Sequence, residues 1–565
     1  MKVIIVGGVA GGATAAARIR RLDEQAEITV YERSGHVSYA NCGLPYYVGG
    51  VIEDPEELTL QTPESFYSRF RIDMKVLHEV VSIDPGQKTV RVRDLKNGEE
   101  FDDGYDKLLL SPGARPVTAG IPGSDLDRVF TLRTVEDTFR IDEYIKDNRP
   151  KSAVIAGGGF IGLELAENLR ELGMEVSIAQ RPAQLMNPFD MDMASFLHAE
   201  VRRHGIDLVL GNNLAEVREN GGQMEVVLED GTVLKTDMAV LAIGVAPDTA
   251  LAESAGLELG IKGSIVVNDR METSVKDIYA VGDAVQVKNF VTDEYALVSL
   301  AGPANKQGRI AADNICGRSS VYTGAQGSSV IKVFDLTAAA TGLSEAAARR
   351  VGLDVDKVIL SPMSHAGYYP GGSLMMLKVV FEKETYRLIG AQAVGRAGVD
   401  KRIDVIATAL RAGMKATELK DLDLAYAPPY SSAKDPVNMA GFMIENISEG
   451  LLKQWYLEDV KRLPRDGSVT LLDARTPEEF AFAHIDGFRN IPVDELRDRL
   501  EEIPEGKPVY VLCESGVRSY IACRILTGHG YDAYNFAGGF RLYDTVVNER
   551  CLLETAEACG RNWRI

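Results

Sequence analysis

The sequence predicts an α/β protein of several domains, and three observations support this fold class. Two segments, residues 1–34 and 152–181, each run from an apolar strand through a glycine-rich turn and a helix to a second strand. The chain has 565 residues, enough for roughly three to four domains at about 150 residues each. Hydrophobic residues make up 45% and charged residues 25% of the chain, so most of it can bury a core.

Composition excludes several classes of partner and site. With 62 Lys plus Arg against 82 Asp plus Glu, the net charge is −20, which repels nucleic acid. The amino terminus leads from a short apolar run straight into glycines, and no run of 18 apolar residues occurs, so we expect neither a signal peptide nor a membrane span. Six scattered cysteines without a C-x-x-C pair predict no disulfide scaffold and no metal site. We therefore expect a cytoplasmic protein.

The first glycine-rich turn predicts a Rossmann-like dinucleotide site. Gly7 and Gly12 hold the outer positions of G-x-G-x-x-G, whereas Val9 replaces the middle glycine and is flanked by Gly8 and Gly11. Glu32 ends the second strand, where a carboxylate can bind the ribose hydroxyls of an adenosine, and Arg33 follows it. Backbone N–H groups at the helix start would face the pyrophosphate.

The second turn matches the motif in full. Gly157, Gly159 and Gly162 lie between a strand and a helix, so the chain carries a second dinucleotide site, and two such sites suggest electron transfer. Gln180 and Arg181 stand at the ribose position in place of an acid. The choice between NADH and NADPH stays open, because an acid favours NADH whereas a basic residue can accept the 2′-phosphate.

Three further apolar strands end in glycine and lead to a family resemblance. They are YDKLLLSPGARP at 105–116 with Gly113, DMAVLAIGVAPDT at 237–249 with Gly244, and TSVKDIYAVGDA at 273–284 with Asp283. Together with the first glycine loop and its acid, they resemble the flavoprotein disulfide reductases that have two dinucleotide-binding domains. The resemblance covers about residues 1–445 and implies FAD in the first domain, with Asp283 on the flavin ribityl chain, and NADH or NADPH in the second. The family more often has A-T-G where this chain has S-P-G.

The resemblance implies a domain plan for the first four-fifths of the chain. A split FAD-binding domain takes residues 1–112 and 244–325, and an NAD(P)H-binding domain takes 113–243. Residues 326–445 mix strands with a helical stretch and form an α+β dimerisation domain in this family, which implies a homodimer. We expect a linker at 446–462.

Cys42 is the predicted nucleophile of the flavin site. Most members of the family have two cysteines in C-x-x-x-x-C, but here SYANCGLPYY has Cys42 alone, so the thiol needs a sulfur partner from outside or its own sulfenic acid. The string S-x-x-N-C-G-L-P-Y resembles coenzyme A disulfide reductases. A thiolate beside a flavin and a helix start would have a lowered pKa.

The usual acid–base histidine of the family is missing, and tyrosines are the expected substitutes. The region that would carry it reads YAPPYSSAKDPVN. Tyr430, together with Tyr368 or Tyr369, is a candidate proton donor reaching across the dimer, and matching tyrosines have that role in coenzyme A disulfide reductases. The alternative is that these phenols only pack loops.

Coenzyme A carries phosphates, so its site should hold local positive charge. We expect Arg18 and Arg21 on the first helix and Arg71 to contribute, although solvated helix charges explain them equally well. Ser38 and Asn41 are the predicted polar neighbours of Cys42.

The last part of the chain, residues 463–565, resembles a rhodanese domain of α/β fold. The carrying segments are LLDARTPEEFAFAHIDGFRNIP and VYVLCESGVRSYIACRIL. In the loop from Cys513 to Arg518, backbone N–H groups would surround a thiolate or persulfide, so Cys513 is the second predicted nucleophile, with Arg518 in its cradle. The loop is one residue shorter than the C-x-x-x-x-x-R of phosphatases. Asp473, Arg475 and His484 are expected to be scaffold, and the other cysteines structural or incidental, namely Cys316, Cys523, Cys551 and Cys559.

Together these observations predict a homodimeric FAD enzyme fused to a sulfur carrier, resembling coenzyme A disulfide reductase–rhodanese fusions. NAD(P)H would reduce coenzyme A persulfide, polysulfide or coenzyme A disulfide at Cys42, and Cys513 would supply sulfane sulfur. One alternative is an NADH oxidase or peroxidase in which Cys42 cycles through a sulfenic acid. Another is a reductase whose rhodanese domain is only a docking module.

Overall fold

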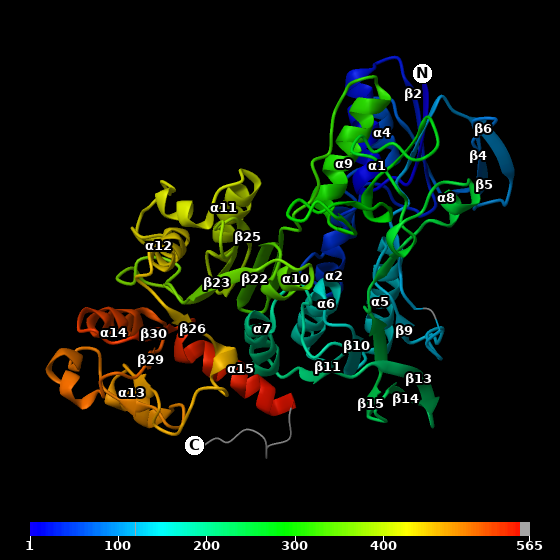
Figure 1. Cartoon of the computed structure of the whole chain (residues 1–565). Coiled ribbons are helices and arrows are strands. Elements are labelled where there is room, and N and C mark those ends of the chain that lie inside the picture. The colour runs from blue at the N-terminus through cyan, green and yellow to red at the C-terminus, as the bar shows by residue number, and fades with distance from the viewer. Residues whose placement is uncertain (119, 554–565) are drawn as a thin grey trace. The chain divides into compact units, whose positions relative to one another are not determined.

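The computed structural model describes residues 1–118 and 120–553 and divides into two compact units (Figure 1). Unit 1 is built from Met1–Ala183 and Gly205–Gly327. Unit 2 is built from Gln184–His204 and Ser328–Ile565. Each unit is described by itself below.

The first sheet of unit 1 is a parallel five-stranded sheet in the order β18-β7-β1-β2-β3. Its strands are nearly continuous apolar runs, as expected for a parallel sheet covered on both faces, and Val3, Ile4 and Ile5 are fully buried. Helices α1 and α9 pack against each other beside it. The elements are β1 Lys2–Val6, α1 Ala10–Leu22, β2 Glu27–Glu32, β3 Asp73–Val76, β7 Lys107–Leu110, β18 Ile278–Ala280 and α9 Ala301–Ile315.

The second sheet of unit 1 repeats this plan in the order β12-β11-β10-β16-β9, again parallel. Its elements are β9 Val129–Phe130, α5 Val135–Asn148, β10 Ser152–Ala156, α6 Phe160–Glu171, β11 Glu175–Gln180, β12 Asp207–Leu210 and β16 Met238–Leu241. The two predicted strand–glycine–helix–strand segments therefore each open a Rossmann-like sheet. The α/β fold class is confirmed.

A two-stranded antiparallel ribbon joins the two sheets of unit 1. Strand β8 Ala114–Pro116 leads the chain out of the first sheet and β17 Val245–Pro247 leads it back. The N–H of Asp248 donates to the carbonyl of Gly113, and the N–H of Val117 donates to the carbonyl of Gly244, both at 3.0 Å. Both predicted strand-end glycines thus mark the crossing between the two halves.

The remaining elements of unit 1 are short helices and antiparallel meanders at its edges. The helices are α2 Leu44–Val48, α3 Pro55–Leu58, α4 Pro63–Phe70 and α8 Ala250–Ser254. The strands are β4 His78–Asp84, β5 Thr89–Asp94, β6 Glu100–Gly104, β13 Leu214–Asn220, β14 Gln223–Leu228, β15 Val233–Thr236, β19 Val287–Lys288 and β20 Tyr295–Ala296.

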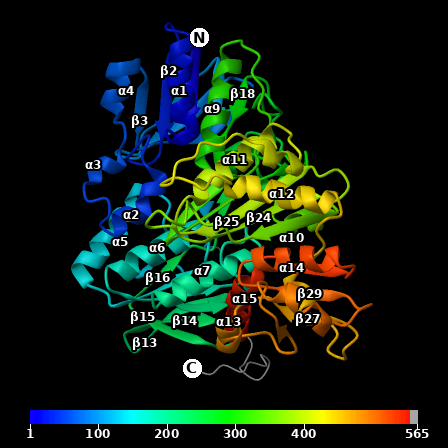
Figure 2. The same cartoon turned by 90° about the vertical axis from the view of Figure 1, so that its left-hand side faces the viewer.

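Unit 2 contains an antiparallel five-stranded sheet in the order β21-β22-β25-β24-β23 (Figure 2). Helix α11 packs on β22 and β25, and α12 packs on β23. The elements are α7 Met191–Arg203, β21 Ser329–Val333, β22 Leu336–Gly342, α10 Glu345–Arg350, β23 Val355–Leu360, β24 Met375–Glu382, β25 Leu388–Gly395, α11 Val399–Arg411 and α12 Pro436–Ser448.

A second, parallel sheet of unit 2 has the order β26-β30-β29-β27-β28. Its core includes Trp455, which stacks on Phe536 with ring centroids 4.2 Å apart and donates to the carbonyl of Val511 at 3.1 Å. The elements are β26 Gln454–Trp455, β27 Thr470–Asp473, α13 Pro477–Phe482, β28 Arg489–Asn490, β29 Val509–Leu512, α14 Val517–Gly528, β30 Ala533–Phe536 and α15 Gly539–Leu553. The edge strand β26 lies within residues 446–462, the segment predicted as a linker.

No helix in the described part of the chain is long and apolar enough to cross a membrane.

A buried ion network lies between α7, α10 and the antiparallel sheet of unit 2. Lys378 on β24 is 1% exposed, and its ammonium lies 3.0 Å from Asp190, 2.8 Å from Asp192 and 2.9 Å from Glu345. Burial alone would lower the pKa of Lys378, but the three carboxylates more than offset it and raise that pKa above its ordinary value. Removing the Lys378 ammonium would leave the three carboxylates without this buried positive charge between them.

We expect Lys378→Met to destabilise this sheet by about 3 to 5 kcal/mol, the usual cost of breaking a buried ion pair on one side. The free energy of opening of the β24 amides, measured by native-state hydrogen exchange, should fall by that amount. Lys383→Met is the matched control, because Lys383 is half-exposed beside Asp354 and a surface pair contributes about 1 kcal/mol or less. Equal effects of the two substitutions would contradict the prediction.

Candidate active site

The first glycine loop closes tightly under the start of α1. Gly7 has φ +98°, and a Cβ there would overlap the Ser111 carbonyl, while a Cβ on Gly12 would overlap the Gly7 carbonyl. The N–H of Gly8 donates to Glu32 Oε2 at 2.8 Å. The first turn of α1 has no acidic residue and no side-chain cap. Loop, acid and helix start therefore form the cradle that an adenosine pyrophosphate fits.

Gly11 and Arg33, two further residues predicted to bind FAD, make contacts within unit 1. Gly11 lies under Val281, so it also supports close packing of the loop. Arg33 extends outward and pairs with Asp248 at 2.8 Å.

The second glycine loop has the same construction around an amide. Gly157 has φ +112°, and a Cβ on Gly162 would overlap the Gly157 carbonyl. Gln180 Oε1 accepts from the N–H of Gly158 at 2.8 Å, as Glu32 does from Gly8 in the first loop. Arg181 is exposed. The amide thus takes the place of the ribose acid, and the exposed guanidinium leaves both nicotinamide cofactors compatible with the site.

We expect Gly162→Ala and Gly159→Ala to separate two roles of this loop. The added methyl at 162 overlaps backbone, so the variant should lose thermal stability and NADH binding together. At 159 nothing lies within 4 Å of an added Cβ, so stability should be unchanged while NADH affinity falls, because the methyl occupies space that the pyrophosphate approaches. Thermal unfolding and NADH titration of both variants test this. Stability lost equally at both positions would contradict it.

Cys42 lies in a short 3₁₀ turn, Asn41–Gly43, that runs directly into α2. Cys42 is a free cysteine and is exposed as a residue, whereas its thiol is partly shielded from solvent. The Asn41 side-chain amide donates to the carbonyl of Arg133 and accepts from Arg133 Nη1, both at 3.0 Å, and Arg133 Nη2 contacts Asp283 Oδ2 at 2.9 Å. The structure therefore brings Asn41 and Asp283 together through Arg133, a residue that carries no motif signal and was missed from the sequence.

The protein groups around Cys42 by themselves raise the pKa of its thiol. The causes are burial first, then the negative charge of Glu164, with Arg133 acting in the opposite direction and Asp283 adding to the rise. The lowering expected beside a bound flavin stays a prediction. Glu164 lies on α6 and accepts from the Tyr46 hydroxyl at 3.3 Å. Burial raises the pKa of Glu164 to about 7, with Glu167 adding to the rise. A carboxyl that titrates near neutrality thus lies beside the segment that carries Cys42, the predicted nucleophile.

We expect Glu164→Gln to lower the pKa of the Cys42 thiol, because it removes the charge that opposes thiolate formation. Alkylation of Cys42 by iodoacetamide, followed as a function of pH, should then be half-maximal at a lower pH. Glu171→Gln serves as the control, since Glu171 is exposed at the end of the same helix. A thiol that alkylates identically in the two variants would rule out this effect of Glu164.

The predicted tyrosines lie on two loops of unit 2, and the structure pairs one of them with a phenol that sequence reasoning missed. The hydroxyls of Tyr368 and Tyr426 are 2.7 Å apart. Tyr369 packs edge-on against His365, with centroids 5.7 Å apart. Tyr430 is exposed and is not part of the pair. The only sequence signal for Tyr426 is its place in the same YAPPY string as Tyr430.

A cavity of about 540 Å³ lies beside these loops in unit 2. It is lined by Ser364, His365, Lys401, Arg402, Tyr426 and Tyr430, among others. Arg402 is 1% exposed and is held by Asp435 at 3.1 Å, so its charge is compensated.

The residues expected to bind coenzyme A are dispersed. Arg18 pairs with Asp313 at 2.8 Å, and Arg21 is exposed. Arg71 ends α4 and lies over the ring of Tyr67 at 5.1 Å. Ser38 has φ +48°, and its N–H donates to the carbonyl of Gly8, which holds it between the first glycine loop and the Cys42 segment.

Cys513 lies at the base of the second candidate site, within unit 2. Its side chain is fully buried, and its Sγ accepts from the N–H of Gly516 at 3.1 Å and from the Ser519 hydroxyl at 3.3 Å. Gly516 has φ +93° and begins α14, which turns this N–H inward. The loop therefore has donors in place for negative charge on sulfur.

The charged residues around this loop are largely committed to one another. Arg518 makes two contacts with Glu479, at 2.6 and 2.7 Å. Arg475 is paired twice with the fully buried Asp473, and its guanidinium carbon lies 3.9 Å from the Phe540 ring centroid. His484 Nδ1 donates to the Phe480 carbonyl at 3.0 Å, and the imidazole stacks on the Phe480 ring.

The other cysteines that the structure describes have no such donors. Cys523 is buried in α14, and burial raises the pKa of its thiol. Burial also raises the pKa of Cys316, which follows α9. The side chain of Cys551 and all of Cys559 lie outside the described residues.

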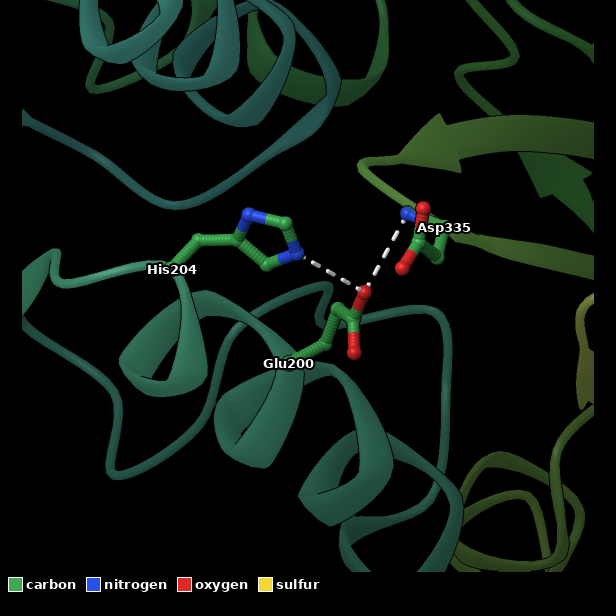
Figure 3. A group of neighbouring side chains, drawn as sticks. All are labelled: Glu200, His204 and Asp335. Carbon is green, nitrogen blue, oxygen red and sulfur yellow. Dashed lines mark hydrogen bonds and ion pairs between the residues drawn. The ribbon is translucent and has the colours of Figure 1, made fainter.

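A group of three side chains in unit 2 has a geometry that could suggest a metal (Figure 3). Glu200, His204 and Asp335 offer ligand atoms within 4.8 Å of one another. Arg203 lies 2.7 Å from Glu200 and 2.9 Å from Asp335. Its guanidinium already supplies the positive charge that the two carboxylates require.

Comparison with protein-family models covers most of the chain. Residues 1–308 match the family described as pyridine nucleotide-disulphide oxidoreductase, and residues 328–436 match its dimerisation domain. Residues 456–545 match the rhodanese-like domain.

Individual proteins are similar to this chain over 78% to 97% of its length. A curated relative, coenzyme A disulfide reductase of Staphylococcus aureus strain JH9, is 38% identical over 442 residues, which cover 78% of this chain and 99% of the relative. The crystal structure of reduced Bacillus anthracis CoADR-RHD has a TM-score of 0.94 and 47% identity, covering 97% of this chain and 98% of that one. The structure of an NAD-dependent persulfide reductase from A. fulgidus has a TM-score of 0.90 and 38% identity, covering 96% and 100%. This chain therefore belongs to the pyridine nucleotide-disulphide oxidoreductase family and carries a rhodanese-like domain after its dimerisation domain.

Proposed function

We propose that this protein is an FAD-dependent enzyme that uses NAD(P)H to reduce coenzyme A persulfide, polysulfide or coenzyme A disulfide at Cys42. Its rhodanese-like domain would act as a sulfur carrier through Cys513. The observation that carries the proposal is the presence of two separate single-thiol sites in one chain, Cys42 exposed and Cys513 cradled by donors. Relatives named for coenzyme A disulfide and for persulfide support the same chemistry.

The residues present fit both cofactors. The cradle of Gly7, Gly12 and Glu32 would hold the adenosine half of FAD, and Asp283 lies in the same unit for its ribityl chain. The loop of Gly157 and Gly162 would hold the nicotinamide cofactor. When bound, FAD supplies the passage of two electrons from the nicotinamide to sulfur.

Cys42 performs the bond exchange. Its thiolate attacks the coenzyme A sulfur of the persulfide, the S–S bond breaks, and hydrosulfide leaves with the electron pair. The product on the protein is a mixed disulfide of Cys42 and coenzyme A. Two-electron reduction of that disulfide returns the thiolate and releases coenzyme A. Because described residues of unit 1 contain only one other cysteine, Cys316 at the end of α9, the exchange uses a single thiol.

A proton must reach the departing thiolate, and tyrosines of the dimerisation domain are the proposed donors. Tyr368, Tyr369 and Tyr430 remain candidates that would reach across a homodimer. Tyr368 is favoured among them because its partner Tyr426 can share the charge of a phenolate through the 2.7 Å contact.

Residues of unit 1 would bind coenzyme A. Ser38 and Asn41 flank the first loop and Cys42, whereas Arg18 is held by Asp313 and is a weaker candidate than the exposed Arg21 and Arg71. The cytoplasmic location stays a prediction.

The test is anaerobic NADH oxidation by the purified FAD-loaded enzyme with coenzyme A disulfide and coenzyme A persulfide side by side, with hydrosulfide release measured. Faster turnover of the persulfide supports sulfur reduction fed by the rhodanese-like domain. Faster turnover of the disulfide would make thiol redox balance the main reaction. Turnover of neither, with rapid aerobic NADH consumption, would replace the proposal by the NADH oxidase alternative.

A further inference from the structure

Three carboxylates are linked to the Cys513 loop through Arg475 and Arg518, and two of them each make two close contacts with one guanidinium group. Asp473 is fully buried and receives two side-chain hydrogen bonds from Arg475 Nε and Nη2, at 3.0 and 2.7 Å. Glu479 receives two from Arg518, which lower the pKa of this carboxyl to about 2. Glu479 is therefore ionised near neutral pH, and both carboxylates already bind a guanidinium group.

Glu514 is the third, and its circumstances differ. It directly follows Cys513, and among the described residues its only ion-pair contact is Arg475 Nη1 at 3.5 Å, on a guanidinium whose other nitrogens already bind Asp473. Its side chain is 39% exposed, so it has access to an incoming molecule. Burial raises the pKa of this carboxyl and Glu479 adds to the rise, while Arg475, Arg518 and Arg541 act against it.

The backbone of Glu514 is held in place from the other side of the loop. Its carbonyl accepts from the N–H of Arg541 at 3.2 Å, and the Cys513 carbonyl accepts from the N–H of Phe540 at 2.7 Å. Gly539 has φ +72°, and a Cβ there would overlap the Glu514 carbonyl, so the first turn of α15 packs directly on the loop. The backbone from which this carboxyl extends is therefore fixed at the residue that follows Cys513.

We propose that Glu514 is the catalytic acid of sulfur transfer to Cys513 and that it selects persulfides of thiols over thiosulfate as donors. The inference rests on the proposed sulfur-carrier role of Cys513 and extends it to the class of donor. Three features carry it: the position next to the nucleophile, the partial exposure, and the absence of the double guanidinium contact that fixes the neighbouring acids.

The step balances without any further reactant. The Cys513 thiolate attacks the terminal sulfur of R–S–SH, a new S–S bond forms, and the bond to the thiol sulfur breaks. The electron pair goes to R–S⁻, which takes the Glu514 proton and leaves as R–SH, while Cys513 keeps the sulfur as Cys513–S–SH. Thiosulfate would instead release sulfite, which leaves without a proton, and as a dianion it would be repelled once Glu514 is ionised.

The experiment measures single-turnover loading of sulfur onto Cys513 in the full-length FAD enzyme, in a Cys42→Ser background, by intact mass. The donors are coenzyme A persulfide, a persulfide of a less basic arenethiol, and thiosulfate. We expect Glu514→Gln to slow loading from coenzyme A persulfide by about 100-fold, to slow the arenethiol persulfide much less, and to leave thiosulfate unchanged or faster. Glu514→Asp should restore most of the rate, and Glu505→Gln, an exposed acid of the same domain, should change nothing.

The outcomes distinguish a failure of the proposed role of Glu514 from a failure of the proposed sulfur-carrier role of Cys513. An equal fall with all three donors would mean that Glu514 only supports the loop, and no fall would mean that the acid is elsewhere; both overturn the inference. If Glu514→Gln does not fold, the unsubstituted protein still decides, because a loading rate that drops steeply with the basicity of the leaving thiol shows that no acid assists it. Sulfur loading that persists in Cys513→Ser would instead show that Cys513 is not the sulfur carrier.

Discussion

Cys42→Ser should reduce anaerobic, sulfur-dependent NADH oxidation by about 1,000-fold or more while leaving cofactor binding intact. A serine hydroxyl does not ionise near neutral pH and cannot exchange with a sulfur–sulfur bond, so the covalent step is lost rather than slowed. Cys42 lies in a 3₁₀ turn and is exposed, so the exchange of sulfur for oxygen removes no core packing. Steady-state NADH oxidation with coenzyme A persulfide measures the loss, and the flavin absorbance spectrum reports that FAD is bound.

The control for this prediction is Cys316→Ser, which changes the other described cysteine of unit 1 and should keep full activity. Sulfur-dependent activity that survives in Cys42→Ser would show that Cys42 is not the nucleophile. Loss in both variants would point to a general effect of removing thiols from this unit.

Cys513→Ser should abolish sulfane-sulfur loading of the rhodanese-like domain, again by about 1,000-fold or more, and leave reduction of coenzyme A disulfide by NADH within about twofold of the parent. The two reactions separate because the donors to the Cys513 sulfur, Gly516 and Ser519, belong to the same loop and helix as the cysteine. Labelled sulfur on the protein and NADH oxidation are measured on the same preparation.

This variant also distinguishes a carrier from a docking module. If the domain only recruits a partner, Cys513→Ser will match the parent with every sulfur donor, persulfides and polysulfides included. If it feeds sulfur to Cys42, turnover with donors that must first load Cys513 will fall while coenzyme A persulfide supplied directly is still reduced. Cys523→Ala is the matched control, because that thiol is buried in α14 without hydrogen-bond donors.

Glycine motifs were the part of the site that could be read from the chain directly. Gly7 and Gly157 have φ of +98° and +112°, and backbone lies where a Cβ on Gly12 or Gly162 would stand. These positions accept little besides glycine, so the glycine pattern in the sequence predicts the geometry of both loops. Apolar strands on either side complete the unit locally. The lone cysteine of N-C-G-L-P-Y and the loop from Cys513 to Arg518 are likewise contiguous strings.

Residues that act through long-range contacts left no such trace. Arg133 contacts both Asn41 and Asp283, which are far apart in sequence. Glu164 contacts Tyr46, near Cys42, from helix α6 beside the second sheet. Tyr426 becomes a candidate only through its contact with Tyr368. Nothing in C-E-S-G-V-R shows that Arg518 binds Glu479 with two contacts whereas Glu514 has a single, longer contact with Arg475. The pKa of the Cys42 thiol is raised by burial and then by the charge of Glu164, which is distant in sequence, while the lowering expected beside a bound flavin stays a prediction.

The sequence by itself thus determined the fold class and the family, and it predicted the two nucleophiles, since these depend on local backbone geometry and on chemistry that a short string can encode. The tertiary structure decided which charges are paired, which carboxyl of the Cys513 loop lacks a double guanidinium contact and which phenols meet. Those properties depend on the dielectric surroundings and on distances of a few ångströms between side chains from separate elements, and the chain order does not specify them until the core has packed.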